Sequence, residues 1–188
     1  MLQLQSGQRV LILGGGGAVG SAAISIAKQL GASHVTAVCS KKDVDRVRQL
    51  GADIVIDRRE DKNWKSDASL SKTFDLVFDA SSSYSFMKDG RKWLKPAGTF
   101  VNAYPLVVEQ MAFGWLWPLL TGKKFKMVNV KVRKSDLVLL SGWLSSDKVS
   151  VLVDSVHPIS KIDEAVKRHQ SGDKNSGSRV VVKVEGGW

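Results

Sequence analysis

Four consecutive glycines, residues 14–17, stand directly between an apolar run (RVLIL, residues 9–13) and a segment rich in helix formers (SAAISIAKQLG, residues 21–31). Each glycine costs conformational entropy on folding, so such a cluster marks a tight turn or a close neighbour of the backbone. Gly15, Gly17 and Gly20 have the spacing G-x-G-x-x-G. Between a strand and a helix, the first glycine makes the turn, the second admits a pyrophosphate and the third lets helix and strand pack closely. The stretch therefore predicts a dinucleotide-binding unit.

The rest of the chain alternates short apolar runs with helix-like segments. We expect strands at residues 9–13, 34–39, 53–57, 74–80 and 98–104, and helices at residues 21–31, 41–51 and 85–95. Strands that alternate with helices of this size predict an α/β fold with a Rossmann-type, doubly wound parallel sheet. The alternating segment FKMVNVKV (residues 125–132) is expected to be the last strand, at the edge of the sheet.

The end of the second expected strand bears on which dinucleotide binds. NAD-binding units usually carry an acid there, which accepts hydrogen bonds from the ribose 2′-hydroxyl. This chain has Ser40, Lys41 and Lys42 instead, and Arg58 follows the third strand. A hydroxyl and several cations suit a 2′-phosphate. Asp43 is expected in the first turn of the next helix as an ordinary capping residue. The sequence therefore favours NADP over NAD.

Composition narrows the class of protein. With 188 residues, the chain holds one domain, or one domain and part of another. Its single cysteine, Cys39, excludes an internal disulfide and a cysteine-rich zinc site. Neither a metal-ligand spacing nor a nucleophile motif is visible. The sequence has no secretory signal and no apolar stretch of membrane-spanning length, so we expect a cytoplasmic protein, with an organellar location left open.

The net charge of +10 is concentrated between Lys88 and Lys134, where ten basic residues face only Asp89 and Glu109. Such a surface favours anions, or is simply a solvated face. An alternative function is thus a non-catalytic NADPH-binding module that recognises RNA or an acidic membrane surface. It rests on charge alone, because no RNA-binding motif with interleaved aromatic residues accompanies it. For MAFGWLWPLLTGKKFK (residues 111–126), burial against another domain or subunit is favoured over lipid binding.

Six segments follow one another across almost the whole chain: GQRVLILGGGGAVGSAAISIAKQLGA, HVTAVCS, LGADIVID, FDLVFDA, LKPAGTFV and HPISKIDEAVKRHQSGDKNSGSRVVVKV. In this order they resemble the coenzyme-binding half of the medium-chain dehydrogenases/reductases, in the zinc-independent quinone oxidoreductase branch. The resemblance implies metal-free hydride transfer from NADPH to a quinone or an activated enone or enal. It also implies a homodimer, here through the edge strand 125–132.

The resemblance has departures. The family's proteins begin with a catalytic, barrel-like domain that this chain lacks. We therefore expect residues 1–150 to form an NADP-binding Rossmann domain. Residues 151–188 are expected to contribute a helix and a strand that return to the absent catalytic domain. A fragment of a longer enzyme and a natural truncated form remain open alternatives, and the chain alone is expected to be inactive or weakly active. Gly15 and Gly16 stand where members often carry Ala and Ser, and Arg58 where Tyr is common.

The remaining site residues follow from strand ends, because ligands bind beyond the carboxyl ends of parallel strands. Residues at the ends of the fourth and fifth strands are expected to border the nicotinamide half. Tyr104 is the one candidate proton donor, although a packing or hydrogen-bonding role is favoured over it; other catalytic residues are not assigned, nor is a metal site. The expected cofactor-binding residues are Gly15, Gly17, Ala18, Val19, Gly20, Ser40, Lys41, Lys42, Arg58, Ala80, Ser81, Asn102, Ala103 and Tyr104.

Overall fold

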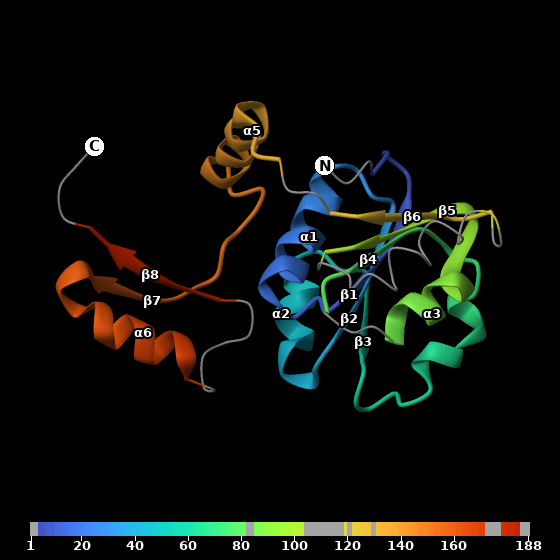
Figure 1. Ribbon diagram of the computed structural model, residues 1–188, viewed down its shortest axis with the longest axis horizontal. Helices are drawn as coiled ribbons and strands as arrows, with labels where there is room; N and C mark the ends of the chain where they lie inside the picture. The colour runs from blue at the N-terminus through green and yellow to red at the C-terminus, as the bar shows by residue number, and fades with distance from the viewer. Residues whose placement is uncertain are drawn as a thin grey trace.

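A six-stranded parallel sheet forms the larger part of the structure, with its strands in the spatial order β3-β2-β1-β4-β5-β6 (Figure 1). The computed structural model describes residues 4–81, 85–103, 119, 122–128, 131–171 and 178–184. The strands are β1 (Arg9–Leu13), β2 (His34–Cys39), β3 (Ile54–Asp57), β4 (Phe74–Asp79), β5 (Leu94–Asn102) and β6 (Lys124–Met127). The strand order reverses between β1 and β4, which pair in parallel. The predicted doubly wound sheet is confirmed.

Helices cover both faces of this sheet. Helices α1 (Ala18–Gln29) and α2 (Val44–Gln49) lie on one face, and α3 (Ser85–Trp93) lies on the other (Figure 1). Strand β1 is buried between the two layers, so its side chains alternate between two cores. Val10 and Ile12 pack with Ile24 of α1, whereas Leu11 and Leu13 join the core on the α3 face. Burial on both faces explains why this strand is a continuous apolar run.

The α3 face is closed by aromatic side chains. Trp64, from the short 3-10 helix η2 (Trp64–Ser66), stacks on Trp93 with ring centroids 5.1 Å apart. Phe86 lies against both rings. Two further 3-10 turns, η1 (Lys41–Asp43) and η3 (Ala68–Leu70), precede α2 and β4. Stacked and tilted aromatic pairs of this kind add to the stability gained from burial.

The fifth strand begins earlier than the sequence predicts. It runs over Leu94–Asn102 rather than from residue 98, because Leu94 is fully buried and pairs with Phe74 of β4. The pairing register then shifts, and Ala97 lies at φ 60° within the irregularity. The edge strand β6 covers Lys124–Met127 and is therefore shorter than the expected strand at residues 125–132.

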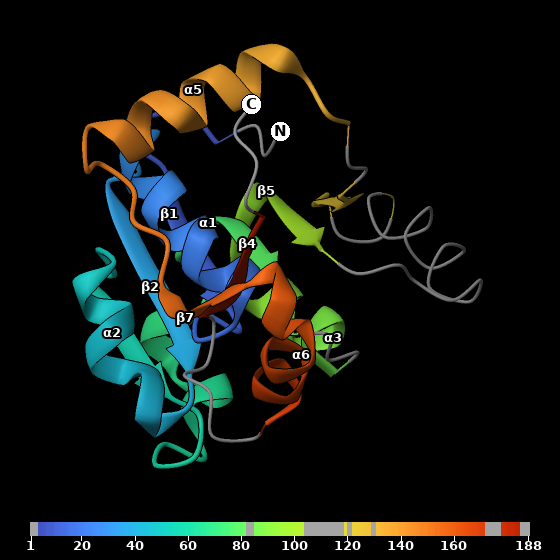
Figure 2. The same ribbon diagram turned by 90° about the vertical axis from the view of Figure 1, so that its left-hand side faces the viewer.

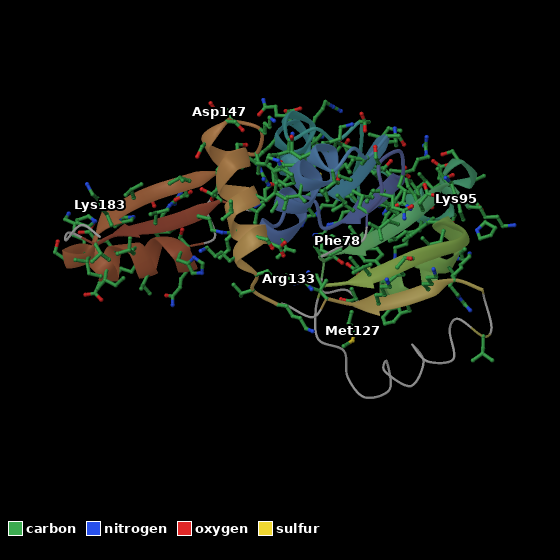
Figure 3. All side chains as sticks on the ribbon, turned by 90° about the horizontal axis from the view of Figure 1, so that it is seen from above. Phe78, Lys95, Met127, Arg133, Asp147 and Lys183 are labelled. Atoms are coloured by element: carbon green, nitrogen blue, oxygen red, sulfur yellow. The ribbon has the colours of Figure 1, made fainter. Side chains whose placement is uncertain are left out.

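Beyond the sheet, the described residues of the C-terminal part form two helices and two strands. Helix α5 (Lys134–Ser145), which the sequence analysis did not predict, buries none of its residues. Strands β7 (Val153–Pro158) and β8 (Arg179–Lys183) form a separate parallel pair, flanked by the 3-10 turn η4 (Ile159–Lys161) and helix α6 (Ile162–Gln170) (Figures 1 and 3). A helix and one strand were expected here, so the segment has one strand more. The expected boundary at residue 150 falls between α5 and β7 and stays a prediction.

Candidate functional site

The glycine loop leaves the carboxyl end of β1 in a turn that only glycine adopts easily. Gly14 has φ 77°, and the amide groups of Gly14 and Gly15 both donate hydrogen bonds to the Val38 carbonyl, at 3.0 and 2.9 Å. A Cβ on Gly14 would also lie 2.9 Å from the Ala80 carbonyl oxygen. The turn glycine is therefore Gly14, not Gly15 as predicted, because spacing alone does not tell which of four adjacent glycines takes the left-handed conformation.

The other glycines have separate tasks. A Cβ on Gly15 would lie 3.1 Å from the Ala37 Cβ, so Gly15 is a packing glycine. A Cβ on Gly20 would overlap the Gly14 carbonyl group, which is the close helix–strand approach expected of the third glycine. Gly17 is the N-cap of α1 at φ −79°, and a Cβ there would meet only the Gly14 oxygen, at 3.4 Å. A side chain on Gly17 would thus fill the space in front of the helix rather than clash with the fold.

The first turn of α1 faces that space. Ala18, Val19 and Gly20 form this turn, where amide N–H groups have no intrahelical acceptor, and the side chain of Val19 is 45% exposed. These N–H groups and the helix dipole together attract an anion. The loop therefore has the open cradle that a pyrophosphate needs, which fits the predicted dinucleotide.

The predicted 2′-phosphate residues gather where β2 and β3 end. The Arg58 amide donates to the Cys39 carbonyl at 3.1 Å, which brings the start of the loop after β3 beside Ser40. Lys42 and Arg58 are exposed there. Lys41 is engaged elsewhere, in an ion pair with Glu60 that raises the pKa of the lysine. The structure therefore makes Lys42 and Arg58 more available to a ligand than Lys41.

Asp43 stands at the N-cap position of α2, at the helix start where the sequence predicts it, but its side chain does not cap the helix. It is 3% exposed, its side chain makes no capping hydrogen bond, and its Oδ1 accepts a hydrogen bond from Arg46 Nη2 at 2.7 Å. Together with Asp57 it also affects the neighbouring thiol. Burial, and then these two carboxylates, raise the pKa of Cys39 to about 11, so the thiol stays neutral.

The carboxyl ends of β4 and β5 complete the site. The Ala80 amide donates to the Leu13 carbonyl at 3.0 Å, and the Ala103 amide donates to the Asp79 carbonyl at 2.9 Å. These bonds hold Ala80, Ser81, Asn102 and Ala103 along the edge where the glycine loop begins. Tyr104 lies outside the described residues, and its role stays a prediction.

Asp79 is a residue of the site that is missing from the set expected from the sequence. It is 1% exposed, and its Oδ1 accepts hydrogen bonds from the Ser81 amide at 2.9 Å and the Ser81 hydroxyl at 2.6 Å. Burial raises the pKa of the Asp79 carboxyl, and the two Ser81 bonds partly oppose this. The sequence signal that could have identified Asp79 was an acidic residue at the end of an apolar strand, next to the reversal of strand order.

A hollow on the α1 face of the sheet lies away from the proposed cofactor site. It is lined by Leu4, Leu76, Phe78, Val101 and Met127, among others, and by none of the described cofactor candidates; Figure 3 labels Phe78 and Met127.

Part of the basic region between Lys88 and Lys134 is neutralised by ion pairs within the chain. Within this region, Lys95 pairs with Asp75 at 2.9 Å and Lys92 pairs with Asp89, to which Lys65 from outside the region is also paired.

Comparison with known proteins identifies the family to which the chain belongs. Residues 18–103 match the family described as zinc-binding dehydrogenase. The trans-enoyl reductase pgmF of Aspergillus terreus is 32% identical over 203 residues, which cover 100% of this chain and 54% of that protein. The mitochondrial NAD(P)H oxidoreductase RTN4IP1 of Homo sapiens is 49% identical over 196 residues, which cover 95% of this chain and 48% of that protein. The chain belongs to the medium-chain dehydrogenase/reductase superfamily.

A solved structure of the same superfamily supports the fold. The quinone oxidoreductase from Coxiella burnetii superposes with a TM-score of 0.74 at 22% identity, over 97% of this chain and 55% of that one. With the sequence relatives, the predicted resemblance to quinone oxidoreductase-like medium-chain dehydrogenases/reductases is confirmed. The chain spans about half the length of the curated relatives it matches, at 54% and 48%.

Two further findings concern the described residues alone. Within them, no three His, Cys, Asp or Glu side chains gather closely enough to hold a metal ion. No helix in this part of the chain combines the length and the apolar character needed to cross a membrane.

Proposed function

We propose that this chain is the coenzyme-binding part of an NADPH-dependent oxidoreductase that reduces an activated double bond. The observation that carries the proposal is the glycine loop at the reversal of strand order. There Gly14 turns the chain, Gly17 leaves the helix start open, and Ala80 closes the other side. The names of the two relatives, a trans-enoyl reductase and an NAD(P)H oxidoreductase, support the reaction type.

The proposed arrangement assigns each half of the cofactor to a strand end. The pyrophosphate lies at the first turn of α1, over Gly17. The 2′-phosphate lies between Ser40, Lys42 and Arg58, whose cations compensate its charge. The nicotinamide half lies against Ala80, Ser81, Asn102 and Ala103. When bound, a reduced nicotinamide supplies a hydride, and this chain binds and orients it.

The substrate proposed is an enone, enal, enoyl thioester or quinone. Each has an electron-poor carbon that accepts a hydride, with a proton added at the neighbouring carbon or oxygen. We also propose that a catalytic domain outside this chain forms the second wall of the site, and that the subunits pair through β6. The location, cytoplasmic or organellar, stays a prediction; the human relative is named mitochondrial.

Calorimetric titration of the chain with NADPH and with NADH tests this function directly. We expect NADPH to bind, and Gly17→Val to prevent binding because its side chain fills the pyrophosphate cradle. Gly142→Ala is the matched control, because a Cβ on Gly142 meets nothing within 4 Å. Absence of binding to both dinucleotides, or equal binding by Gly17→Val and the wild type, would contradict the proposal.

A further inference from the structure

A buried ion pair joins helix α2 to the glycine loop. Arg46 Nη2 donates to Asp43 Oδ1 and also to the Gly16 carbonyl oxygen, both at 2.7 Å. The side chains of Arg46 and Asp43 are only 16% and 4% exposed. We propose that Arg46, held by Asp43, is a positioning residue that fixes the Gly16 carbonyl and so orients the pyrophosphate-binding turn of α1. This inference rests on the proposed function.

The environment of the pair separates it from an ordinary helix-surface ion pair. Arg48 and Asp45, on the same helix and at the same i, i+3 spacing, are 3.7 Å apart with side chains 61% and 95% exposed. Solvent screens such a pair, and it contributes little. The Asp43–Arg46 pair is withdrawn from water, where removal of one partner leaves an uncompensated buried charge. The buried pair therefore holds one geometry firmly.

The contact with Gly16 acts on the loop because the Gly16–Gly17 peptide is held at both ends. Its carbonyl accepts from Arg46 at 2.7 Å, and its N–H donates to the Gly14 carbonyl at 2.9 Å. The peptide plane leads directly into the N-cap and first turn of α1. Its direction therefore sets where the free N–H groups of that turn point.

Gly16 also makes room for the Asp43–Arg46 pair. A Cβ on Gly16 would lie 2.7 Å from the Asp43 Cγ, so the carboxylate occupies the place that a side chain at position 16 would take. The absence of a side chain there lets Asp43 sit under the loop and hold Arg46. Arg46 Nη1 is also buried, and has no hydrogen-bond partner among the described residues. Arg46 Nη2, by contrast, donates hydrogen bonds to the Gly16 carbonyl and to Asp43.

The test compares Arg46→Met with Arg48→Met in the full 188-residue chain. The first readout is amide hydrogen exchange without ligand at Gly17 and Ser21, whose N–H groups donate to the Gly14 and Gly17 carbonyls, both at 2.9 Å. The second is the dissociation constant of NADPH and of 2′-AMP, which has the 2′-phosphate but no pyrophosphate. We expect Arg46→Met to speed exchange and to weaken NADPH about tenfold, as expected for a lost hydrogen bond to a charged group, while 2′-AMP binds as before. Arg48→Met should change none of these values.

Each other result decides the question as well. Unchanged exchange and NADPH affinity in a folded Arg46→Met variant would overturn the proposal. Equal weakening of NADPH and 2′-AMP would make Arg46 a direct phosphate ligand instead, which also overturns it. If the wild type binds no dinucleotide, the proposed function fails, and the exchange rates alone decide the positioning role. Should Arg46→Met not fold, Arg46→Lys keeps the charge beside Asp43 but loses the second hydrogen bond, and should speed exchange in the same way.

Discussion

At the scale of single residues, the glycines of the loop differ in what a substitution would disturb. Gly17→Val leaves the packing open, so we expect a change in unfolding free energy of about 1 kcal/mol or less, as at other N-caps, together with loss of NADPH binding. Gly20→Ala places a methyl group on the Gly14 carbonyl, and such overpacking costs about 1–3 kcal/mol. Thermal unfolding and calorimetry of both variants measure the contrast. A strongly destabilised Gly17→Val would contradict the open cradle.

The preference between NADPH and NADH is expected to depend on Lys42 and Arg58. The double variant Lys42→Ala/Arg58→Ala should lose most of the preference, because each charge-assisted phosphate contact contributes about 1.5–3 kcal/mol. Lys41→Ala should have a smaller effect, since Lys41 is paired with Glu60. Arg59→Ala, at the next exposed position, is the control. The ratio of the two dissociation constants is the measurement, and a wild type that binds both dinucleotides equally would refute the prediction.

The two carboxylates of β4 should respond to pH with opposite signs. Burial raises the pKa of Asp79, so the folded state holds that proton more tightly and stability falls as pH rises through the raised pKa. For Asp75, burial favours a higher pKa, but the Arg9 amide and Lys95 outweigh it and lower the pKa. The stability from Asp75 is thus present above its ordinary pKa and lost as pH falls.

Asparagine at each position tests these signs. Asp79→Asn keeps an acceptor for Ser81 and removes the buried charge, so at pH 7 the variant should be at least as stable as the wild type. Asp75→Asn loses the Lys95 ion pair and should cost about 1 kcal/mol at pH 7, the usual value of a hydrogen bond. Urea unfolding between pH 4 and pH 8 measures both. Destabilisation by Asp79→Asn equal to that by Asp75→Asn would contradict the assignment.

At the scale of elements, the edge strand β6 is where a second copy is expected to pair. The Val128 amide donates to Asn102 of β5, so alternation along the strand turns the Met127 N–H toward the open edge. Met127→Pro removes that outward donor while keeping the bonds to β5, and should convert a dimer to a monomer. Light scattering at several concentrations measures the change. A wild type that stays monomeric at high concentration would remove the basis for the prediction.

The C-terminal unit of α6, β7 and β8 exposes apolar side chains that no described residue covers. Arg168 holds Asp154 with two hydrogen bonds of 2.6 and 2.8 Å, which ties α6 to β7. Val153 and Val156 of β7 are nevertheless 53% and 60% exposed. In Figure 2, α6 and β7 lie in front of the sheet as a separate unit. Such exposed apolar side chains are expected to pack against a further domain.

At the scale of the whole molecule, we predict that the chain alone binds NADPH but turns over slowly or not at all. The proposed phosphate and ribose contacts lie within the glycine loop and the ends of β2 and β3. Catalysis also needs a wall that holds the acceptor about 3–3.5 Å from the reacting carbon and excludes water. An NADPH oxidation assay with enones and quinones, with and without a catalytic domain fused before residue 1, tests this. Full activity of the chain alone would refute it.

The sequence by itself determined the elements whose signals are local. Strands β1 and β2 lie at the predicted residues, and the parallel sheet followed from alternation of strands and helices. Burial on both faces leaves a continuous apolar run, which can be read without knowing the neighbours. The dinucleotide loop was likewise visible, because a glycine cluster between a strand and a helix carries its own geometric meaning.

Only the tertiary structure decided which residue does which task within those elements. Gly14 rather than Gly15 makes the turn because Ala80, far along the chain, lies against it. At the N-cap position of α2, Asp43 pairs with Arg46 instead of capping the helix with its side chain, because the glycine loop leaves room for its carboxylate. Leu94 starts β5 because Phe74 pairs with it. In each case the deciding neighbour is distant in sequence, so local propensity does not contain the answer.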